Sequence, residues 1–133
     1  MVLVAHRRMT SPSMIKSRLL SIYLFEVVRV VNNQHLFRLG NQTEGVALAV
    51  MNNISEAQSC QSRRDLIHKL KLAHKEIREA ESLSIHFTER NGIPRSWKQT
   101  INSLLDELGR LMSSSIATAI RNQQRPPKDQ MRA

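Results

Sequence analysis

The chain has 133 residues, of which 41% are hydrophobic and 4% aromatic, with four glycines and four prolines. This length suits one domain, and the scarcity of glycine, proline and aromatic residues favours helices over sheets. The formal net charge of +9 favours anionic partners at low salt.

The sequence lacks several features of secreted and membrane proteins, and this indicates its cellular compartment. Cys60 is the single cysteine, which excludes an internal disulfide framework and favours a reducing compartment. No apolar run of signal-peptide length follows Arg7 and Arg8. The longest apolar stretch, residues 19–31, contains Glu26 and Arg29 and is too short to span a membrane. We therefore expect a soluble, cytoplasmic protein without membrane association.

Most of the excess positive charge lies near the two ends. Residues 1–18 carry four basic side chains and no acidic one, and residues 121–133 carry four basic side chains and one acidic one. We expect a flexible basic arm over residues 1–10, a helical domain over residues 11–122 and a basic disordered tail over residues 123–133. The start of translation is open among Met1, Met9 and Met14.

The first predicted helix covers residues 12–31. Ser11 followed by Pro12 is a good N-cap and first-turn pair. From Leu19 to Val31 the segment is apolar nearly all round, and its length without a turn signal favours helix over strand. A helix that is apolar on every side is buried on every side. We therefore expect one face to pack within the protomer and another to meet a second protomer.

Residues 36–57 and 63–90 are predicted to form two amphipathic helices joined by a tight polar turn. Apolar residues recur at spacings of three and four along both segments. Ser62 stands three residues before Asp65, so its hydroxyl can cap the second helix. Asn91 and Gly92 are expected to end that helix ahead of Pro94. Gly40 and Gly45 weaken the first of the two helices by about 1 kcal/mol each.

A last helix is predicted to follow the capping box of Ser96 and Gln99 and to run to Asn122. Its principal seam comprises Trp97, Ile101, Leu104, Leu108, Leu111 and Ser115. A second set widens the stripe beyond what one bundle core needs: Leu105, Met112, Ile116 and Ile120. Four helices with short connections predict an all-α, antiparallel, up-down-up-down four-helix bundle.

The hairpin turn resembles that of a four-helix-bundle family whose reading frames lie inside intervening sequences of bacterial 23S ribosomal RNA genes. That family carries N-I-A-E-G, a polar turn, Ser with two basic residues, an acid–apolar pair, E-x-E and a closing G-Y-I. The matching residues are Asn53-Ile54-Ser55-Glu56-Ala57, Ser62-Arg63-Arg64-Asp65-Leu66, Glu79, Glu81 and Gly92-Ile93. The resemblance covers about residues 37–120. Through residues 107–112 the chain is also similar, more distantly, to the accessory variability proteins of diversity-generating retroelements.

The resemblance implies a bundle that assembles as a ring-like homopentamer. The more distant similarity to the retroelement proteins also implies a partnership with a reverse transcriptase and its RNA. The chain departs from the family where Glu44 and Gly45 replace two basic residues, and where Ala57 replaces the turn glycine. The usual N-terminal Asp and Trp are absent as well. Arg63 and Arg64 do match, so the implied basicity applies to their helix and not to the preceding one.

Metal binding would require a set of ligands that this chain supplies only in part. Bundles that hold two irons carry Glu-x-x-His on two helices and a Glu on each of the others. Here Asp65-x-x-His68 is one imperfect copy, with Glu26 and Glu107 as lone carboxylates. The histidines His74 and His86 have no acidic partner at ligand spacing. We therefore expect no metal.

Catalytic signatures are similarly incomplete. Cys60 lies near the start of a predicted helix and beside Arg63, which could depress its pKa, but the closest base along the chain is His68. The sequence contains no glycine-rich phosphate loop and no G-x-S-x-G motif. We expect neither enzymatic activity nor a cofactor.

A basic surface is the remaining candidate for a function. On the helix predicted over residues 63–90, positions 64, 71, 75 and 78 fall on roughly one face, where they could pair with phosphates. The candidate nucleic-acid-binding residues are Arg63, Arg64, Lys71, Lys75, Arg78, Arg121, Arg125 and Lys128. Acidic residues of the same helix could instead neutralise the stripe, for instance by pairing Glu79 with Lys75. Because aromatic residues are few, any binding should contact the backbone of RNA or DNA without reading bases.

Two functions of different kinds follow. The first is a non-enzymatic, oligomeric adaptor that binds RNA or DNA weakly and without sequence specificity. The second is a protein-interaction scaffold whose charge serves solubility alone. Salt-dependent binding to generic RNA would separate them.

Overall fold

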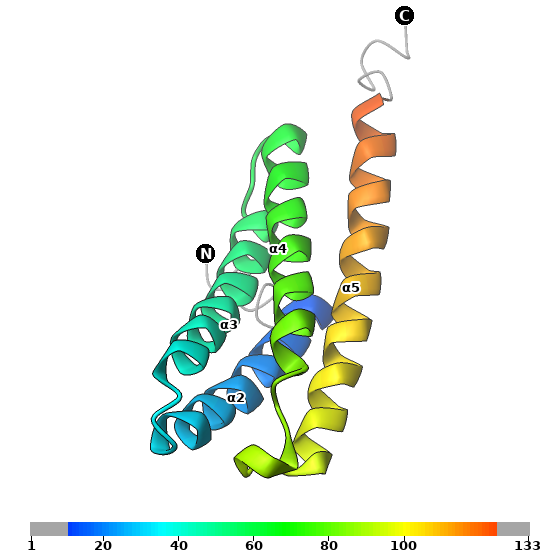
Figure 1. Cartoon of the computed structure of the whole chain (residues 1–133). Helices are drawn as coiled ribbons and strands as arrows, with labels where there is room; N and C mark the ends of the chain where they lie inside the picture. The colour runs from blue at the N-terminus through cyan, green and yellow to red at the C-terminus, as the bar shows by residue number, and fades with distance from the viewer. Residues whose placement is uncertain (1–10, 125–133) are drawn as a thin grey trace, which may run out of the picture.

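The computed structural model describes residues 11–124, which form four long helices and one short 3₁₀ turn (Figure 1). The helices are α2 (Pro12–Asn33), α3 (Phe37–Gln58), α4 (Arg63–Ser84) and α5 (Arg95–Gln124), with η1 (Glu89–Asn91) between the last two. Residues 11–124 contain no strand, so the all-α prediction is confirmed for this part of the chain. Within it, no helix has the length and apolar character needed to cross a membrane.

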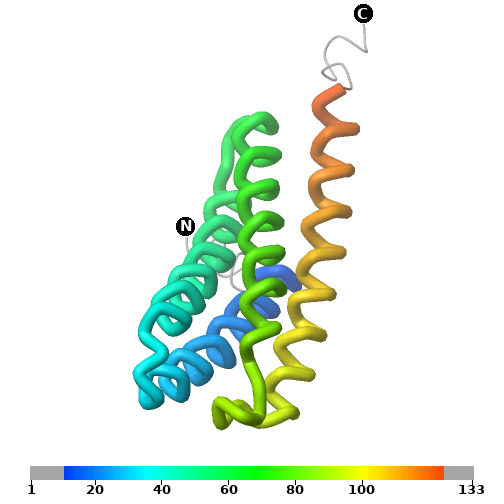
Figure 2. Tube along the Cα trace, in the orientation of Figure 1, coloured from blue at the N-terminus to red at the C-terminus, as the bar shows by residue number. Residues whose placement is uncertain are grey.

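The four helices pack as a bundle in which each helix contacts the next one along the chain, and α2 also contacts α5. The colours of Figure 2 show that each helix runs back along the one before it, with α2 passing obliquely behind α4. Connections of three and four residues, at 34–36 and 59–62, leave no room for any other course between the first three helices. The helix pairs α2–α4 and α3–α5 therefore lie on the two diagonals.

Two serines begin helices as the sequence predicts. The backbone N–H of Met14 donates to Ser11 Oγ at 3.2 Å, with Pro12 in the first turn of α2. At the start of α4, the N–H of Asp65 donates to Ser62 Oγ at 3.1 Å. Each hydroxyl satisfies a backbone donor that has no partner inside its helix.

The predicted end of the third long helix is wrong, because α4 stops at Ser84 and not at Arg90. Beyond it the chain bends through an extended Thr88 into η1, and Gly92, with φ of 78°, caps that short turn. The bend buries the side chains of Phe87 and Ile93 completely, to 0% and 1% exposure. Burying two large apolar side chains stabilises the fold by several kcal/mol. This gain exceeds the stabilisation that α4 would obtain by continuing to Arg90.

The predicted bounds of the last helix are also corrected. α5 begins at Arg95, because the N–H groups of Trp97 and Lys98 already donate to the carbonyl oxygen of Pro94. Ser96 therefore lies inside the helix and does not cap it. α5 continues through Gln124, two residues beyond the predicted boundary. The predicted arm over residues 1–10, and the tail from residue 125 onward, lie outside the described residues.

The core takes apolar side chains from all four helices, and from Phe87 and Ile93 at one end. Leu105 and Met112 are both buried inside it, so they complete the protomer core and are not surplus as predicted. One face of α2 packs in the core of the protomer, as expected for the first helix. The face of α2 opposite Leu24 is exposed and carries an apolar stripe, the α2 apolar stripe, made of Ile15, Leu19 and Ile22.

Salt bridges link neighbouring helices at the surface. Lys16 Nζ lies 2.6 Å from Glu107 Oε2 and joins α2 to α5, and Lys69 pairs with Glu56 to join α4 to α3. The Lys16 ammonium lowers the pKa of Glu107 from its ordinary value. All four side chains are partly exposed, so each pair contributes little to stability.

Two glycines of α3 differ in what surrounds them, which gives a test of the helix packing. A methyl group added at Gly45 would meet no atom, whereas one added at Gly40 would collide with Oδ1 of Asn32 at the end of α2. We expect Gly45→Ala to raise the free energy of unfolding by about 1 kcal/mol through helix propensity. Gly40→Ala should gain less or lose stability. Urea unfolding followed by circular dichroism measures both, and equal stabilisation would contradict a close α2–α3 crossing at Gly40.

Candidate nucleic-acid interface

Four of the predicted basic residues lie on one exposed face of α4, which we call the α4 basic face: Arg64, Lys71, Lys75 and Arg78. The opposite face of the helix is buried through Leu70, Ala73 and Ile77, so the four cations point away from the bundle. At 1.5 Å per residue, the α4 basic face extends for about 21 Å. The structure therefore brings these four residues together as the helical spacing predicts.

None of the four cations is neutralised by a salt bridge within residues 11–124. The alternative salt bridge of Lys75 with Glu79 is not formed, although the charge of Lys75 acts on the Glu76 carboxyl. Lys69 differs, because it pairs with Glu56 of α3, and the hydrogen bond between them raises the pKa of Lys69. The charges of the α4 basic face are thus available to a phosphate, whereas that of Lys69 is used inside the fold.

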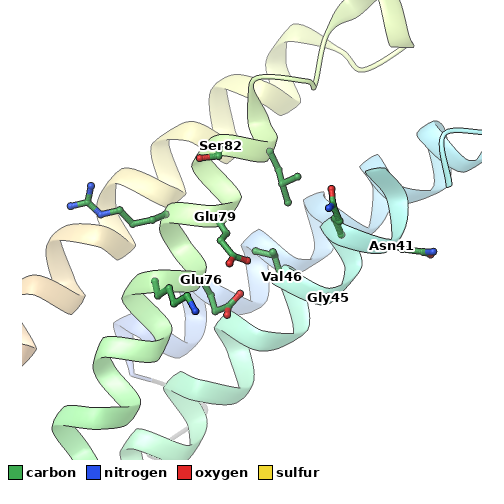
Figure 3. Close-up of a pocket in the computed structure, with 10 residues that line it drawn as sticks. Asn41, Gly45, Val46, Glu76, Glu79 and Ser82 are labelled. Atoms are coloured by element: carbon green, nitrogen blue, oxygen red, sulfur yellow. The ribbon is translucent and has the colours of Figure 1, made fainter. Parts of the chain in front are cut away.

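Two acidic residues of α4, Glu76 and Glu79, lie at the edge that faces α3, whereas Glu81 lines a groove on the α5 side together with Arg78 and Asp106. Figure 3 shows Glu76 and Glu79 beside Val46 and Gly45, in a surface groove between the two helices. Partial burial, the charge of Glu79 and a hydrogen bond with Glu79 together raise the pKa of Glu76. The Glu76 carboxyl therefore holds its proton to a higher pH than an isolated glutamate does. Lys75 and Arg78 also line this groove, so the acidic edge borders the α4 basic face without covering it.

The other predicted residues are placed elsewhere. The guanidinium of Arg63 donates to the backbone oxygen of Asn122, where it satisfies a carbonyl in the last turn of α5. Arg121 donates to Thr118 Oγ1 at 3.3 Å on the same helix. Arg63 and Arg121 thus lie at one end of the bundle and not on the α4 basic face. Arg125 and Lys128 fall outside the described residues.

One residue of this surface was missed by sequence reasoning. His68 is exposed on the outward side of α4, between Arg64 and Lys71. Its spacing of four residues from Arg64 and three from Lys71 is the signal that places it there. The imidazole offers ring nitrogens that can donate to a phosphate oxygen.

The candidate metal and catalytic groups are dispersed. Within residues 11–124, no three His, Cys, Asp or Glu side chains come together as a metal site. Glu26 and Glu107 are held in salt bridges with Arg29 and Lys16. The Cys60 thiol donates to the carbonyl oxygen of Glu56 at 3.3 Å. Nothing in this arrangement adds a chemical site to the basic surface.

Comparison with known proteins gives one match. A family model described as 23S rRNA-intervening sequence protein matches residues 13–114 of the 133-residue chain. No curated protein and no solved structure matches the chain. The matched residues include the whole of α3 and α4, and with them the α4 basic face.

The raised pKa of Glu76 predicts how stability depends on pH. A carboxyl whose pKa is higher in the folded state binds more protons when the protein is folded. The free energy of unfolding therefore falls as the pH rises from the pKa of the unfolded state through the pKa of the folded state. We expect Glu76→Gln to stabilise the protein at pH 7 and to have a smaller effect at pH 4. The gain should be modest because the groove is open to solvent. Thermal unfolding at both pH values measures it, with Glu81→Gln on the same helix as control.

If Glu76→Gln instead lowered the stability equally at pH 4 and pH 7, the result would show that the pKa of Glu76 is not raised in the folded state.

Proposed function

Because the chain belongs to the family of 23S rRNA-intervening sequence proteins, we propose that it is a non-enzymatic adaptor that binds RNA or DNA through the α4 basic face. The observation that carries the proposal is the set of four exposed cations on one helix face, none of them paired with a carboxylate within residues 11–124. Contacts of lysine and arginine with phosphates fix the position of a protein on a nucleic acid but carry no sequence information. The binding is therefore weak and largely independent of sequence.

The strength of such binding follows from counterion release. Each phosphate contact with duplex DNA adds about −0.9 to the slope of log K against log salt concentration, so four contacts give a slope of about −3.6. Contacts of this kind act in water and are individually feeble. Several copies of the α4 basic face, held in one assembly, would raise the apparent affinity by avidity.

The α2 apolar stripe supports such an assembly. Ile15, Leu19 and Ile22 are spaced four and three residues apart, and Ile22 is 60% exposed. A contiguous exposed apolar patch is typical of a protein–protein contact. We propose that this stripe meets further copies of the chain in a homo-oligomer. The family resemblance supports a pentamer, and the retroelement resemblance supports a reverse transcriptase as a further protein partner.

Charge reversal on the α4 basic face tests nucleic-acid binding. We expect the triple variant Arg64→Glu, Lys71→Glu, Lys75→Glu to weaken binding to unrelated RNA sequences alike, by about tenfold or more at low salt, and to reduce the salt slope by about 3. Fluorescence anisotropy with labelled RNA at several salt concentrations measures both quantities. Deleting residues 125–133, which include Arg125 and Lys128, should weaken binding further.

The matched control reverses three cations that already pair with carboxylates, as Arg29→Glu, Arg95→Glu, Arg110→Glu. It changes the net charge by the same amount and should retain more of the affinity. Equal losses in both triple variants would contradict a role for the α4 basic face. If the unmodified protein binds no nucleic acid at low salt, the protein-interaction scaffold is the better proposal.

Substitution on the α2 apolar stripe tests the assembly. We expect the double variant Leu19→Lys, Ile22→Lys to dissociate an oligomer into the 15.3 kDa chain, because charged side chains cannot be buried unpaired at an interface. Size-exclusion chromatography with light scattering measures the mass. Ile85→Lys serves as the control, since Ile85 is an exposed apolar residue just beyond α4. A monomer of the unmodified protein would refute the assembly, whereas another stoichiometry would refute only the pentamer.

A further inference from the structure

The turn between α2 and α3 holds two exposed rings next to each other. His35 and Phe37 lie with ring centroids 5.6 Å apart in an edge-to-face arrangement. Phe37 is 54% exposed although it is a large apolar side chain. The core of the protomer therefore does not account for the position of this ring.

The backbone of the turn makes the presence of a histidine there informative. His35 has φ of 62°, and it is the only residue other than glycine with positive φ among residues 11–124. The N–H of His35 donates to Asn32 O and that of Leu36 to Val31 O, which is the Schellman arrangement that ends many helices. Glycine is the usual residue at this left-handed position because it adopts positive φ without strain. Histidine is among the few other residue types that are enriched in this conformation, so the turn keeps its shape while it presents an exposed imidazole.

The turn is held in place and lies in a basic environment. The Gln34 side chain donates to the backbone oxygen of Asn91 in η1, which ties the turn to a second segment. Between Glu26 and Glu44 the sequence contains no acidic residue. Two exposed arginines, Arg38 in the first turn of α3 and Arg90 beside Asn91, form no salt bridge within the described part of the chain. Exposed rings on segments that also carry unpaired cations are complementary to a nucleotide, which combines a flat base with a negative phosphate.

The ring of Phe37 lies on the side of α3 that borders the groove next to the α4 basic face. Phe37 lies one helical turn before Asn41 and two turns before Gly45, so the three share a side of α3. Asn41 and Gly45 line the groove whose other wall includes Lys75 and Arg78 of the α4 basic face (Figure 3). Figure 1 places the α2–α3 turn at the same end of the bundle as the end of α4. A phosphate backbone that follows α4 toward Arg78 is thereby led toward Phe37.

We infer that His35 and Phe37 form a stacking platform for an unpaired nucleobase, at the end of the path that the α4 basic face offers to a phosphate backbone. The inference rests on the proposed function and narrows its ligand to a single strand, or to a duplex with an unpaired end. It differs from the sequence-based expectation that aromatic stacking plays no part. Stacking on a ring accepts every base, so it adds affinity for bases without adding sequence specificity.

Two labelled single strands of equal length and charge test the inference. One is an oligoadenylate, and in the other each interior nucleotide is replaced by an abasic spacer. We expect the full-length protein to bind the oligoadenylate about tenfold more tightly than the abasic strand, from the stacking of one base. Phe37→Ala should remove this preference and leave the affinity for the abasic strand unchanged, while Phe37→Trp should retain it.

A second variant separates stacking from a structural role of the histidine. His35→Gly should raise the thermal stability, because glycine relieves the positive φ, and should lower the preference for the base-bearing strand. If neither strand binds the unmodified protein, the proposed function fails together with the inference. If both strands bind equally, or if Phe37→Ala keeps the preference, the inference fails and the proposed function stands. A changed oligomeric mass for Phe37→Ala would overturn the inference by assigning the ring to a contact between copies.

Discussion

Burial of one face of α4 between α3 and α5 determines where every charge of that helix lies. Ala73 and Ile77 are completely buried, and the helical period then fixes the direction of each residue between them. Positions toward α3 carry Lys69, which forms a salt bridge, and the Glu76–Glu79 pair. The outward positions carry the α4 basic face, whose members Lys75 and Arg78 also reach the groove beside α3, and Arg78 the groove beside α5. The same packing that holds the bundle together thus separates Lys69, which is paired within the fold, from the cations that remain available to a ligand.

The acidic groove beside the α4 basic face limits how a nucleic acid can approach. Burial and the charge of Glu79 raise the pKa of Glu76. The two acidic side chains make this edge of α4 unfavourable for a phosphate. A phosphate backbone is therefore favoured along the outward ridge of α4 and at the rim of the groove, where Lys75 and Arg78 lie, and the apolar part of the groove suits uncharged groups. The apolar side chains of Val46 and Leu83 in its walls are consistent with that division.

Much of this structure could be predicted from the sequence, because the decisive signals are local. Spacings of three and four residues locate the helices, and the serines before α2 and α4 cap them as expected. The clustering of Arg64, Lys71, Lys75 and Arg78 needs only the helical period. The end of α4 was mispredicted because it depends on burying Phe87 and Ile93 against residues distant in the sequence. The orientation of Glu79 toward Glu76, and the exposure of Phe37, likewise depend on how α3 and α4 pack, which no short window of sequence contains.

The positions of α2 and α4 in the bundle connect the two proposals about assembly and binding. The two helices lie on one diagonal, since each packs mainly against α3 and α5. The α2 apolar stripe and the α4 basic face both point away from the core, and they consequently lie on opposite sides of the protomer. An assembly that buries the α2 apolar stripe leaves every α4 basic face on its outer surface. Copies joined in this way would present their cations together to one nucleic-acid chain, which is the geometry that avidity requires.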